Sequence, residues 1–187
     1  MGIWQAAMVF FLSGVAWLPA AVPGKGFEWN SPVVVRSLFT ADLGMLDTER
    51  EEYATNLASL AANQVVTANA SLQSLADARR LLALALHLSP RNKRAIVVNF
   101  QLAKGVLPEV TAGHYSAQAF ARLLLSRGQL LKNQGGAENQ RMAQLFVYLA
   151  AVMDPKNEDA VFASEVNRLD HGALDWSAIT DGSLKTP

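Results

Sequence analysis

The chain has 187 residues, enough for one compact domain of roughly 100 to 150 residues with an appendage, and 51% of them are apolar. It contains no cysteine, which excludes disulfides, thiolate metal sites, iron–sulfur centres and a cysteine nucleophile. Lys and Arg number 16 and Asp and Glu also number 16, so the zero net charge argues against bulk attraction to nucleic acid.

Residues 1–24 carry no charged side chain. An uncharged apolar run of this length can span a bilayer as a helix, which needs about 20 residues. Small residues at Ala20 and Ala21 suit a cleaved signal peptide, whereas Trp4 and Trp17 suit the two interfaces of an uncleaved anchor. A buried helix of a soluble protein is the third alternative. We expect an exported or membrane-anchored protein, on the periplasmic or extracytoplasmic face.

Residues 25–47 lack helical periodicity and are interpreted as an extended tether, or as a strip lying on the domain. The region 48–172 is rich in Ala, Leu, Gln and Arg and is predicted to be a helical domain. Asp47 and Thr48, with Glu51 three residues later, have the form of a capping box at its start. Residues 173–187 are predicted to be a C-terminal tail.

Six helices are expected in the domain, all joined by short turns that favour antiparallel neighbours. Glycines stand at several of the expected ends. The expected ranges are 48–68, 73–88, 92–104, 116–133, 138–153 and 157–169.

Two stretches of this domain are related by a constant offset of 65 residues, 78–92 over 143–157. Each has a small residue, a bulky apolar residue four later, an alanine three later and a proline five beyond. The first three positions share one helix face, and the proline ends the helix. Ala78, Leu82 and Ala85 form this face in the first copy.

Each stretch resembles the second helix and closing turn of a tetratricopeptide repeat. This resemblance implies an all-α fold, a short tetratricopeptide-like α-solenoid of antiparallel helix pairs. The solenoid would lie behind the N-terminal hydrophobic helix that the apolar run predicts. The preceding helices lack the aromatic, Leu-Gly and Tyr positions usual in the family. An unrelated helical bundle therefore stays open as an alternative.

The sequence offers few candidate catalytic or metal-binding residues. The histidines are His87, His114 and His171, and none lies in a His-Glu-x-x-His pair. Asp170 beside His171 is a weak candidate because neighbouring residues on a helix point apart, and His87 is expected to be a partly exposed structural residue. Phosphate-binding glycine loops and nucleophile elbows are absent from the sequence. We predict neither an enzyme nor a cofactor or metal site.

Six basic residues and no acidic one lie between Ala78 and Gly105. Helical arrays present a concave surface to partners, so this run is a candidate docking patch for an acidic protein segment or anionic lipid, and solvation of a helix and turn is the plain alternative. Nucleic acid is not expected as a partner. The candidate partner-binding residues are Arg79, Arg80, Arg91, Lys93 and Arg94.

The zero net charge is the sum of one basic region of the sequence and two acidic regions. Residues 79–141 hold ten basic and two acidic side chains, whereas residues 28–77 and 154–181 each hold two basic and seven acidic ones. Since the Debye length is only about 8 Å at physiological salt, such blocks act locally. Two functions fit this pattern: a non-enzymatic protein-protein interaction scaffold or adaptor, or a structural subunit that self-associates by stacking its repeats.

Overall fold

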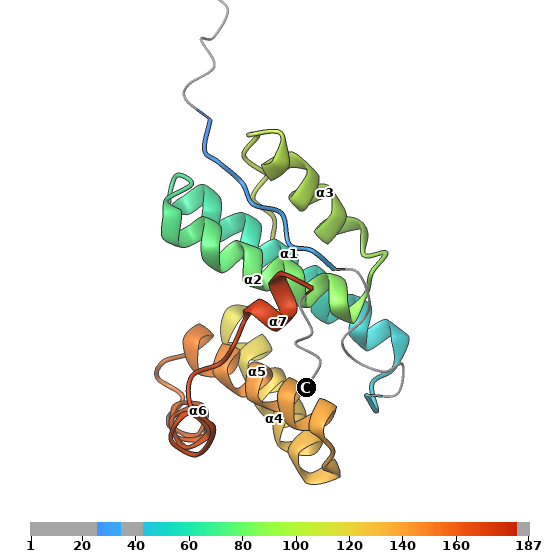
Figure 1. The fold of residues 1–187 in the computed structure, drawn as a ribbon, viewed down its shortest axis with the longest axis vertical. Helices are drawn as coiled ribbons and strands as arrows, with labels where there is room; N and C mark the ends of the chain where they lie inside the picture. The colour runs from blue at the N-terminus through green and yellow to red at the C-terminus, as the bar shows by residue number, and fades with distance from the viewer. Residues whose placement is uncertain (1–25, 35–42, 183–187) are drawn as a thin grey trace, which may run out of the picture.

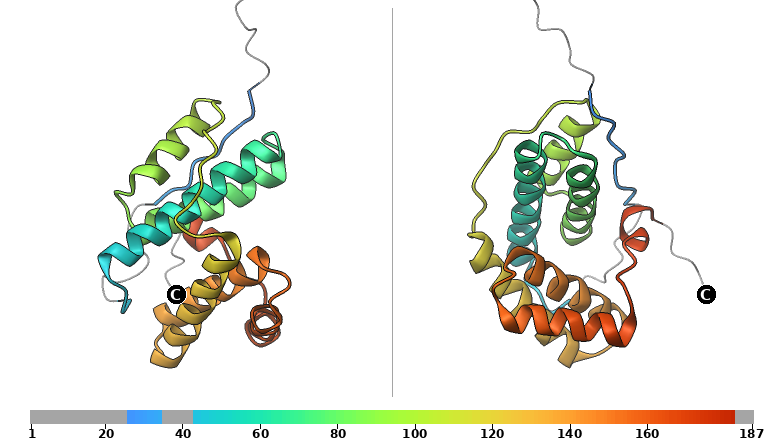
Figure 2. Two further views of the ribbon diagram at one scale, coloured as in Figure 1. Left: turned by 180° about the vertical axis from the view of Figure 1, so that it is seen from behind. Right: turned by 90° about the vertical axis from the view of Figure 1, so that its left-hand side faces the viewer.

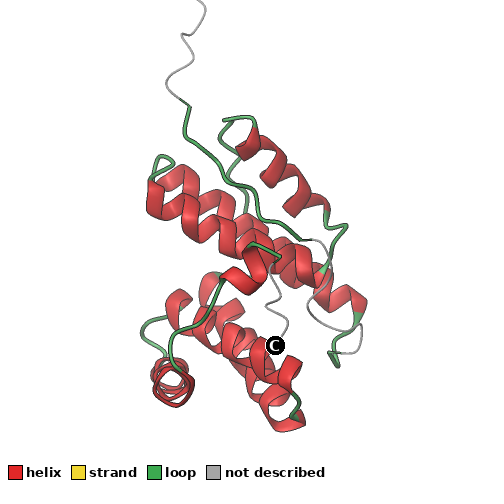
Figure 3. Cartoon of the chain, in the orientation of Figure 1, coloured by secondary structure: helices red, strands yellow, loops and turns green. Residues whose placement is uncertain are grey.

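The computed structural model describes residues 26–34 and 43–182, and Figure 1 shows their arrangement. All regular structure in this part of the chain is helical (Figure 3). The helices are α1 (Asp47–Thr67), α2 (Leu72–Leu88), α3 (Lys93–Ala103), α4 (Ala117–Gln134), α5 (Ala137–Met153), α6 (Glu158–His171) and α7 (Ser177–Thr180). The first six agree with the expected ranges to within two residues.

The expected hydrophobic helix at 1–24 lies outside the described residues. Within residues 26–34 and 43–182, no helix combines the length and the apolar character that crossing a membrane requires.

Helices α1, α2 and α3 form a first unit, in which α1 and α2 pack along each other and α3 packs on both (Figure 1). The expected inward face of α2 is confirmed, because Ala78, Leu82 and Ala85 are fully buried. Helix α1 contributes a complementary row of small buried residues that includes Ala54, Ala58 and Ala61. Small side chains on both helices allow the two backbones to approach closely.

Helices α4, α5 and α6 form a second unit, in which α4 packs along α5 and α6 packs on α5 (Figure 2). Gly128 makes the α4–α5 contact possible. A Cβ at this position would lie 2.9 Å from Cγ2 of Val147 and 3.2 Å from the carbonyl oxygen of Ala143. The second unit therefore depends on a missing side chain where the first uses alanines.

Aromatic rings and one ion pair join the two units. The ring of Tyr53 on α1 meets Phe120 edge-on, with centroids 5.2 Å apart, and lies 5.9 Å from Phe146. Arg127 on α4 donates to both carboxylate oxygens of Glu49 on α1, at 2.6 Å and 3.1 Å. Burial, followed by the charge of Glu49, raises the pKa of Tyr53 to about 12, so its hydroxyl stays protonated.

Residues 26–34 of the expected tether lie on the domain as an extended strip, whereas its last residue, Asp47, belongs to α1. The Val33 amide donates to the carbonyl oxygen of Thr180 at 2.8 Å, which links the strip to α7. Helix α7 packs on α2 and falls within the expected tail, where the sequence analysis missed it. One buried apolar side chain, Ile179, fixes this short helix against the first unit.

The expected capping box at the start of α1 is not formed. The residue that precedes the helix is Leu46, and no side chain caps the first turn. Glu51 instead accepts hydrogen bonds from the Ser89 hydroxyl and from Nδ2 of Asn92, the latter at 2.8 Å. Glu51 thus makes a tertiary contact with the turn after α2 in place of the expected capping hydrogen bond at the start of α1.

Loop 104–116 connects the two units and is held on α1 by amide side chains. Asn63 pairs with the backbone of Thr111 in both directions, donating at 2.9 Å and accepting at 3.2 Å. Oδ1 of buried Asn56 accepts from the Tyr115 amide at 3.2 Å. The loop thus satisfies backbone groups without forming secondary structure.

Candidate functional site

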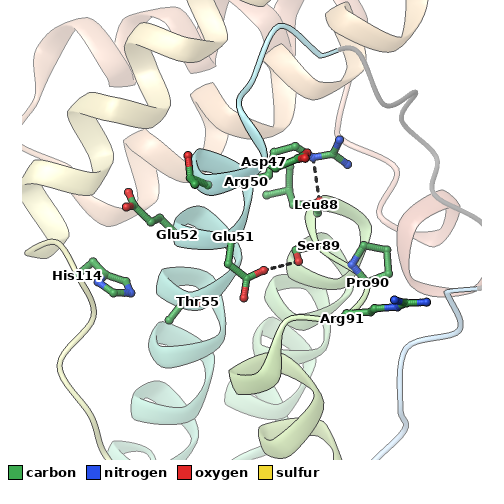
Figure 4. Close-up of a pocket in the computed structure, with 11 residues that line it drawn as sticks. Asp47, Arg50, Glu51, Glu52, Thr55, Leu88, Ser89, Pro90, Arg91 and His114 are labelled. Atoms are coloured by element: carbon green, nitrogen blue, oxygen red, sulfur yellow. Dashed lines mark hydrogen bonds between the residues drawn. The ribbon is translucent and has the colours of Figure 1, made fainter.

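An open cleft of about 800 Å³ lies between the start of α1 and the turn after α2 (Figure 4). Its walls include Glu51 and Glu52 from α1, and Ser89 and Arg91 from the turn. His114 from loop 104–116 lies on the far side of α1 from that turn (Figure 4).

The polar groups of this cleft serve the fold. Glu51 holds the turn, and Glu52 accepts from the Tyr115 hydroxyl, a bond that raises the pKa of Tyr115. Arg50 donates Nε to the carbonyl oxygen of Leu88 at the end of α2, at 2.9 Å. Among the described residues, His114 has no hydrogen-bond partner.

The turn that borders the cleft has the same hydrogen bonds as the turn 65 residues later. The amide of Asn92 donates to Ser89 O at 3.0 Å, and the amide of Asn157 donates to Asp154 O at 2.9 Å. Each asparagine side chain then caps the next helix, accepting from Ala95 N at 2.9 Å and from Ala160 N at 3.1 Å. The repeat found in the sequence is therefore a repeat of backbone geometry.

Of the five candidate basic residues, Arg79 and Arg94 hold other parts of the chain. Arg79 donates Nε to Asn30 O at 2.9 Å and Nη2 to Thr180 O at 3.2 Å, and pairs with Asp181 at 2.6 Å. Arg94 donates to the carbonyl oxygen of Glu109 at 2.6 Å, and burial lowers the pKa of its guanidinium.

The other three are more accessible, but they do not form one patch. Arg91 and Lys93 are exposed beside each other, at the turn and at the start of α3. Arg80 lies on α2, where it pairs with Asp77 at 3.0 Å and stands over the Trp176 ring, 5.8 Å from its centroid. The structure thus separates Arg80 from the basic residues that precede and begin α3.

His87 differs from its expected exposure. The ring is 1% exposed, and Nε2 lies 3.0 Å from the carbonyl oxygen of Ile179. A carbonyl oxygen only accepts, so Nε2 carries the proton. Burial lowers the pKa of this imidazole, which favours the neutral form. His87 therefore links α2 to α7 through a buried hydrogen bond.

The least covered part of the second unit is α6. Ala160 is its one fully buried residue, whereas the side chains of Phe162 and Leu169 are more than 70% exposed. Such large exposed apolar side chains on one helix are typical of a docking surface.

Grooves flank α6 on both sides. A groove of about 270 Å³ lies toward α4 and α5 and is lined by Gly128, Val147 and Phe162. One of about 510 Å³ lies toward α7 and is lined by Arg141, Tyr148 and Trp176. His171 lines both grooves and is exposed at the end of α6.

This surface was not predicted from the sequence. Its aromatic members, Tyr148 and Trp176, contact edge-on with centroids 6.0 Å apart although they are distant in the chain. A usable signal was present in the sequence: Phe162 and Leu169 are large apolar residues seven positions apart, which places them on one face of the helix. In residues 26–34 and 43–182, no cluster of three or more His, Asp or Glu residues is placed to hold a metal ion.

No protein-family model matches the sequence, and no characterised protein or solved structure shows significant similarity to the chain.

Proposed function

We propose that the chain is a non-enzymatic protein-protein interaction scaffold or adaptor, exported or held at a membrane, that docks a partner along α6. The single observation that carries this proposal is the uncovered apolar face of α6 between two grooves. Aromatic and arginine side chains line these grooves, and such residues supply much of the binding energy in protein interfaces.

The proposal includes a finer architecture. The pairs α1–α2 and α4–α5 are antiparallel repeat units of a short tetratricopeptide-like solenoid, and α3 and α6 are the helices that follow each closing turn. The matched hydrogen bonds of the two turns support this interpretation. In an array of this kind each helix pair covers the next, which gives a reason for the open face of α6.

The test compares recovery of partners by the full chain and by a double variant, Phe162→Asp with Leu169→Asp. Both side chains are largely exposed, so the fold and its helical circular dichroism are expected to be unchanged. Recovery of a stoichiometric partner from native membranes, measured by quantitative mass spectrometry, is expected to fall at least about tenfold, since central apolar residues dominate interfaces.

Leu72→Asp is the matched control, because Leu72 is even more exposed but lies at the start of α2. Its partner recovery is expected to equal that of the wild type. Equal recovery by the α6 double variant, or recovery of no stoichiometric protein by the wild type, would overturn docking along α6. Binding of the recovered partner must then be repeated with both proteins purified.

Self-association is the second candidate, and the charges of α3 and α6 favour it. Helix α6 carries Glu158, Asp159 and Glu165, whereas exposed Arg91 and Lys93 stand at the start of α3. Opposite charges on the helices that end the two units allow copies to stack head to tail. Light scattering of the purified chain distinguishes the two: a defined oligomer that dissociates in the α6 double variant supports stacking, and a monomer supports the adaptor.

A further inference from the structure

Helix α3 is apolar on two opposite faces. Ala95, Val98 and Leu102 are fully buried against the first unit. On the opposite side, Ile96, Val97 and Phe100 form an exposed stripe, with Phe100 61% accessible. Spacings of three and four residues place them on one face of the helix. Part of α3 therefore presents an apolar surface that the described residues leave uncovered.

The charged side chains on α3 itself and at its two ends are all positive. Lys93 and Lys104 stand at its two ends, both exposed, and Nζ of Lys104 lies 5.6 Å from the Phe100 ring centroid. Arg91 is exposed in the turn just before α3. No acidic residue occurs between positions 78 and 105. An apolar stripe bounded by lysines suits a layer whose surface is anionic and whose interior is apolar.

The strip 26–34 brings the chain to this same helix. Trp29 donates its indole N–H to Oδ1 of Asn99 on α3, at 3.0 Å. In every view the described strip begins beside the end of α3 that leads into loop 104–116 (Figures 1 and 2). Only Lys25 separates the uncharged stretch 1–24 from this strip in the sequence. A chain held in a bilayer by residues 1–24 would thus have α3 close to the lipid surface.

We propose that α3 lies flat on an anionic bilayer, with Ile96, Val97 and Phe100 in the boundary between headgroups and acyl chains. Lys93 and Lys104 contact the lipid phosphates. This inference rests on the membrane-held form of the proposed function, but it involves different residues from the partner surface. Because α6 lies at the opposite end of the molecule from α3, it is then held away from the membrane (Figure 1).

The experiment uses the absence of cysteine from the sequence, which permits labelling at one introduced site. Full-length Val97→Cys and Phe162→Cys are each labelled with an environment-sensitive fluorophore. Position 162 is the matched control because it lies 65 residues later, at the equivalent place on α6. Vesicles contain phosphatidylcholine alone or with phosphatidylglycerol, and part of the lipid carries a nitroxide quencher near the headgroup.

With phosphatidylglycerol present, emission from position 97 is expected to shift to the blue and to be quenched, while position 162 stays solvent-exposed. Adding Lys93→Glu with Lys104→Glu is expected to lower the ratio of docked to undocked α3 about tenfold or more. Loss of the response at position 97 in phosphatidylcholine alone would agree with recognition of anionic lipid.

Three results would overturn the proposal. The chain could fail to float with vesicles, the probe at position 97 could be as exposed as the probe at 162, or the shielding at position 97 could be unchanged by Lys93→Glu with Lys104→Glu. Shielding that disappears on dilution and occurs in detergent without lipid would instead assign the stripe to a second copy of the chain. Docking along α6 is tested by separate variants, so failure of one proposal is distinguishable from failure of the other.

Discussion

His87 shows how one buried imidazole ties a terminal helix to the domain. Its proton on Nε2 is donated to the Ile179 carbonyl oxygen, and the neutral ring is favoured because burial lowers the pKa. In the unfolded chain the same ring has a pKa near 6.5. Below that pH the unfolded state takes up a proton that the folded state resists, so the free energy of unfolding contributed by His87 is present above pH 6.5 and falls as pH drops.

We predict that His87→Gln removes part of the acid sensitivity of the fold. The glutamine amide can still donate to Ile179 but does not titrate. Between pH 7.5 and 5, the wild type is expected to lose stability relative to this variant, by at most about 1.4 kcal/mol per pH unit. Urea unfolding of both proteins across this range measures the difference, and parallel pH profiles would contradict the prediction.

Gly113 is a second residue whose role depends on a close approach. A Cβ there would lie 2.3 Å from Oδ1 of Asn56, the atom that accepts from the Tyr115 amide. We predict that Gly113→Ala breaks this bond and lowers the free energy of unfolding by about 1–3 kcal/mol, because Asn56 is buried. Ala112→Ser, at the exposed neighbouring position, is the control and is expected to unfold like the wild type.

At the scale of elements, the two closing turns make a matched pair. Asn92 and Asn157 cap their helices in the same way, but Asn92 is fully buried and also donates Nδ2 to Glu51 and to Thr55, each at 2.8 Å. Asn157 makes the cap with its side chain partly exposed. The first turn is thus tied to α1, and no corresponding bond to α4 is found for the second.

We predict that Asn157→Ala costs about 1 kcal/mol of stability, the usual value of a helix cap. Asn92→Ala is expected to cost about 1–3 kcal/mol more, since Glu51 and Thr55 lose a buried partner. Thermal and chemical denaturation of the two variants measures this difference. Equal losses would mean that the bonds of Asn92 to α1 contribute nothing to stability.

The same turns show what sequence reasoning can reach. The helices and their ends were predicted well because proline and glycine act locally on the backbone. The 65-residue offset is also visible in the sequence itself. The capping box at Asp47 and Thr48 was wrong because Glu51 has a better partner in Ser89, which is distant in sequence. Helix α7 was missed because four residues carry too little periodicity, and the helix is held by contacts that are distant in sequence, among them the packing of Ile179 and its hydrogen bond with His87.

The candidate site was less predictable than the fold. A run of basic residues identifies charge, but it does not show that Arg79 and Arg94 turn inward to backbone carbonyl oxygens. The grooves beside α6 combine residues from α4, α5, α6 and the segment before α7, so they exist only after those elements pack.

At the scale of the whole molecule, Arg79 joins segments from both ends of the described chain. Its guanidinium binds Asn30 in the strip, and Thr180 and Asp181 at the end of α7. We predict that Arg79→Met increases amide hydrogen exchange in residues 26–34 and 177–181, while α4 and α5 stay protected. Mass spectrometry resolves these segments.

Arg122→Met is the control, because Arg122 is exposed on α4. Its exchange pattern is expected to match the wild type. Unchanged protection of the strip in Arg79→Met would mean that Trp29 and Val33 hold it without the arginine.

The contact between the strip and α7 also bears on the order in which the protein can mature during synthesis. The amide of Val33, the guanidinium of Arg79 and the ring of His87 all find acceptors between Ile179 and Asp181. A ribosome makes those acceptors 92 residues after His87 and 101 residues after Arg79, and later still after Val33. The first three helices can therefore emerge and pack early. Until residue 181 has left the exit tunnel, however, these donors lack their acceptors, and this side of the first unit stays accessible to chaperones.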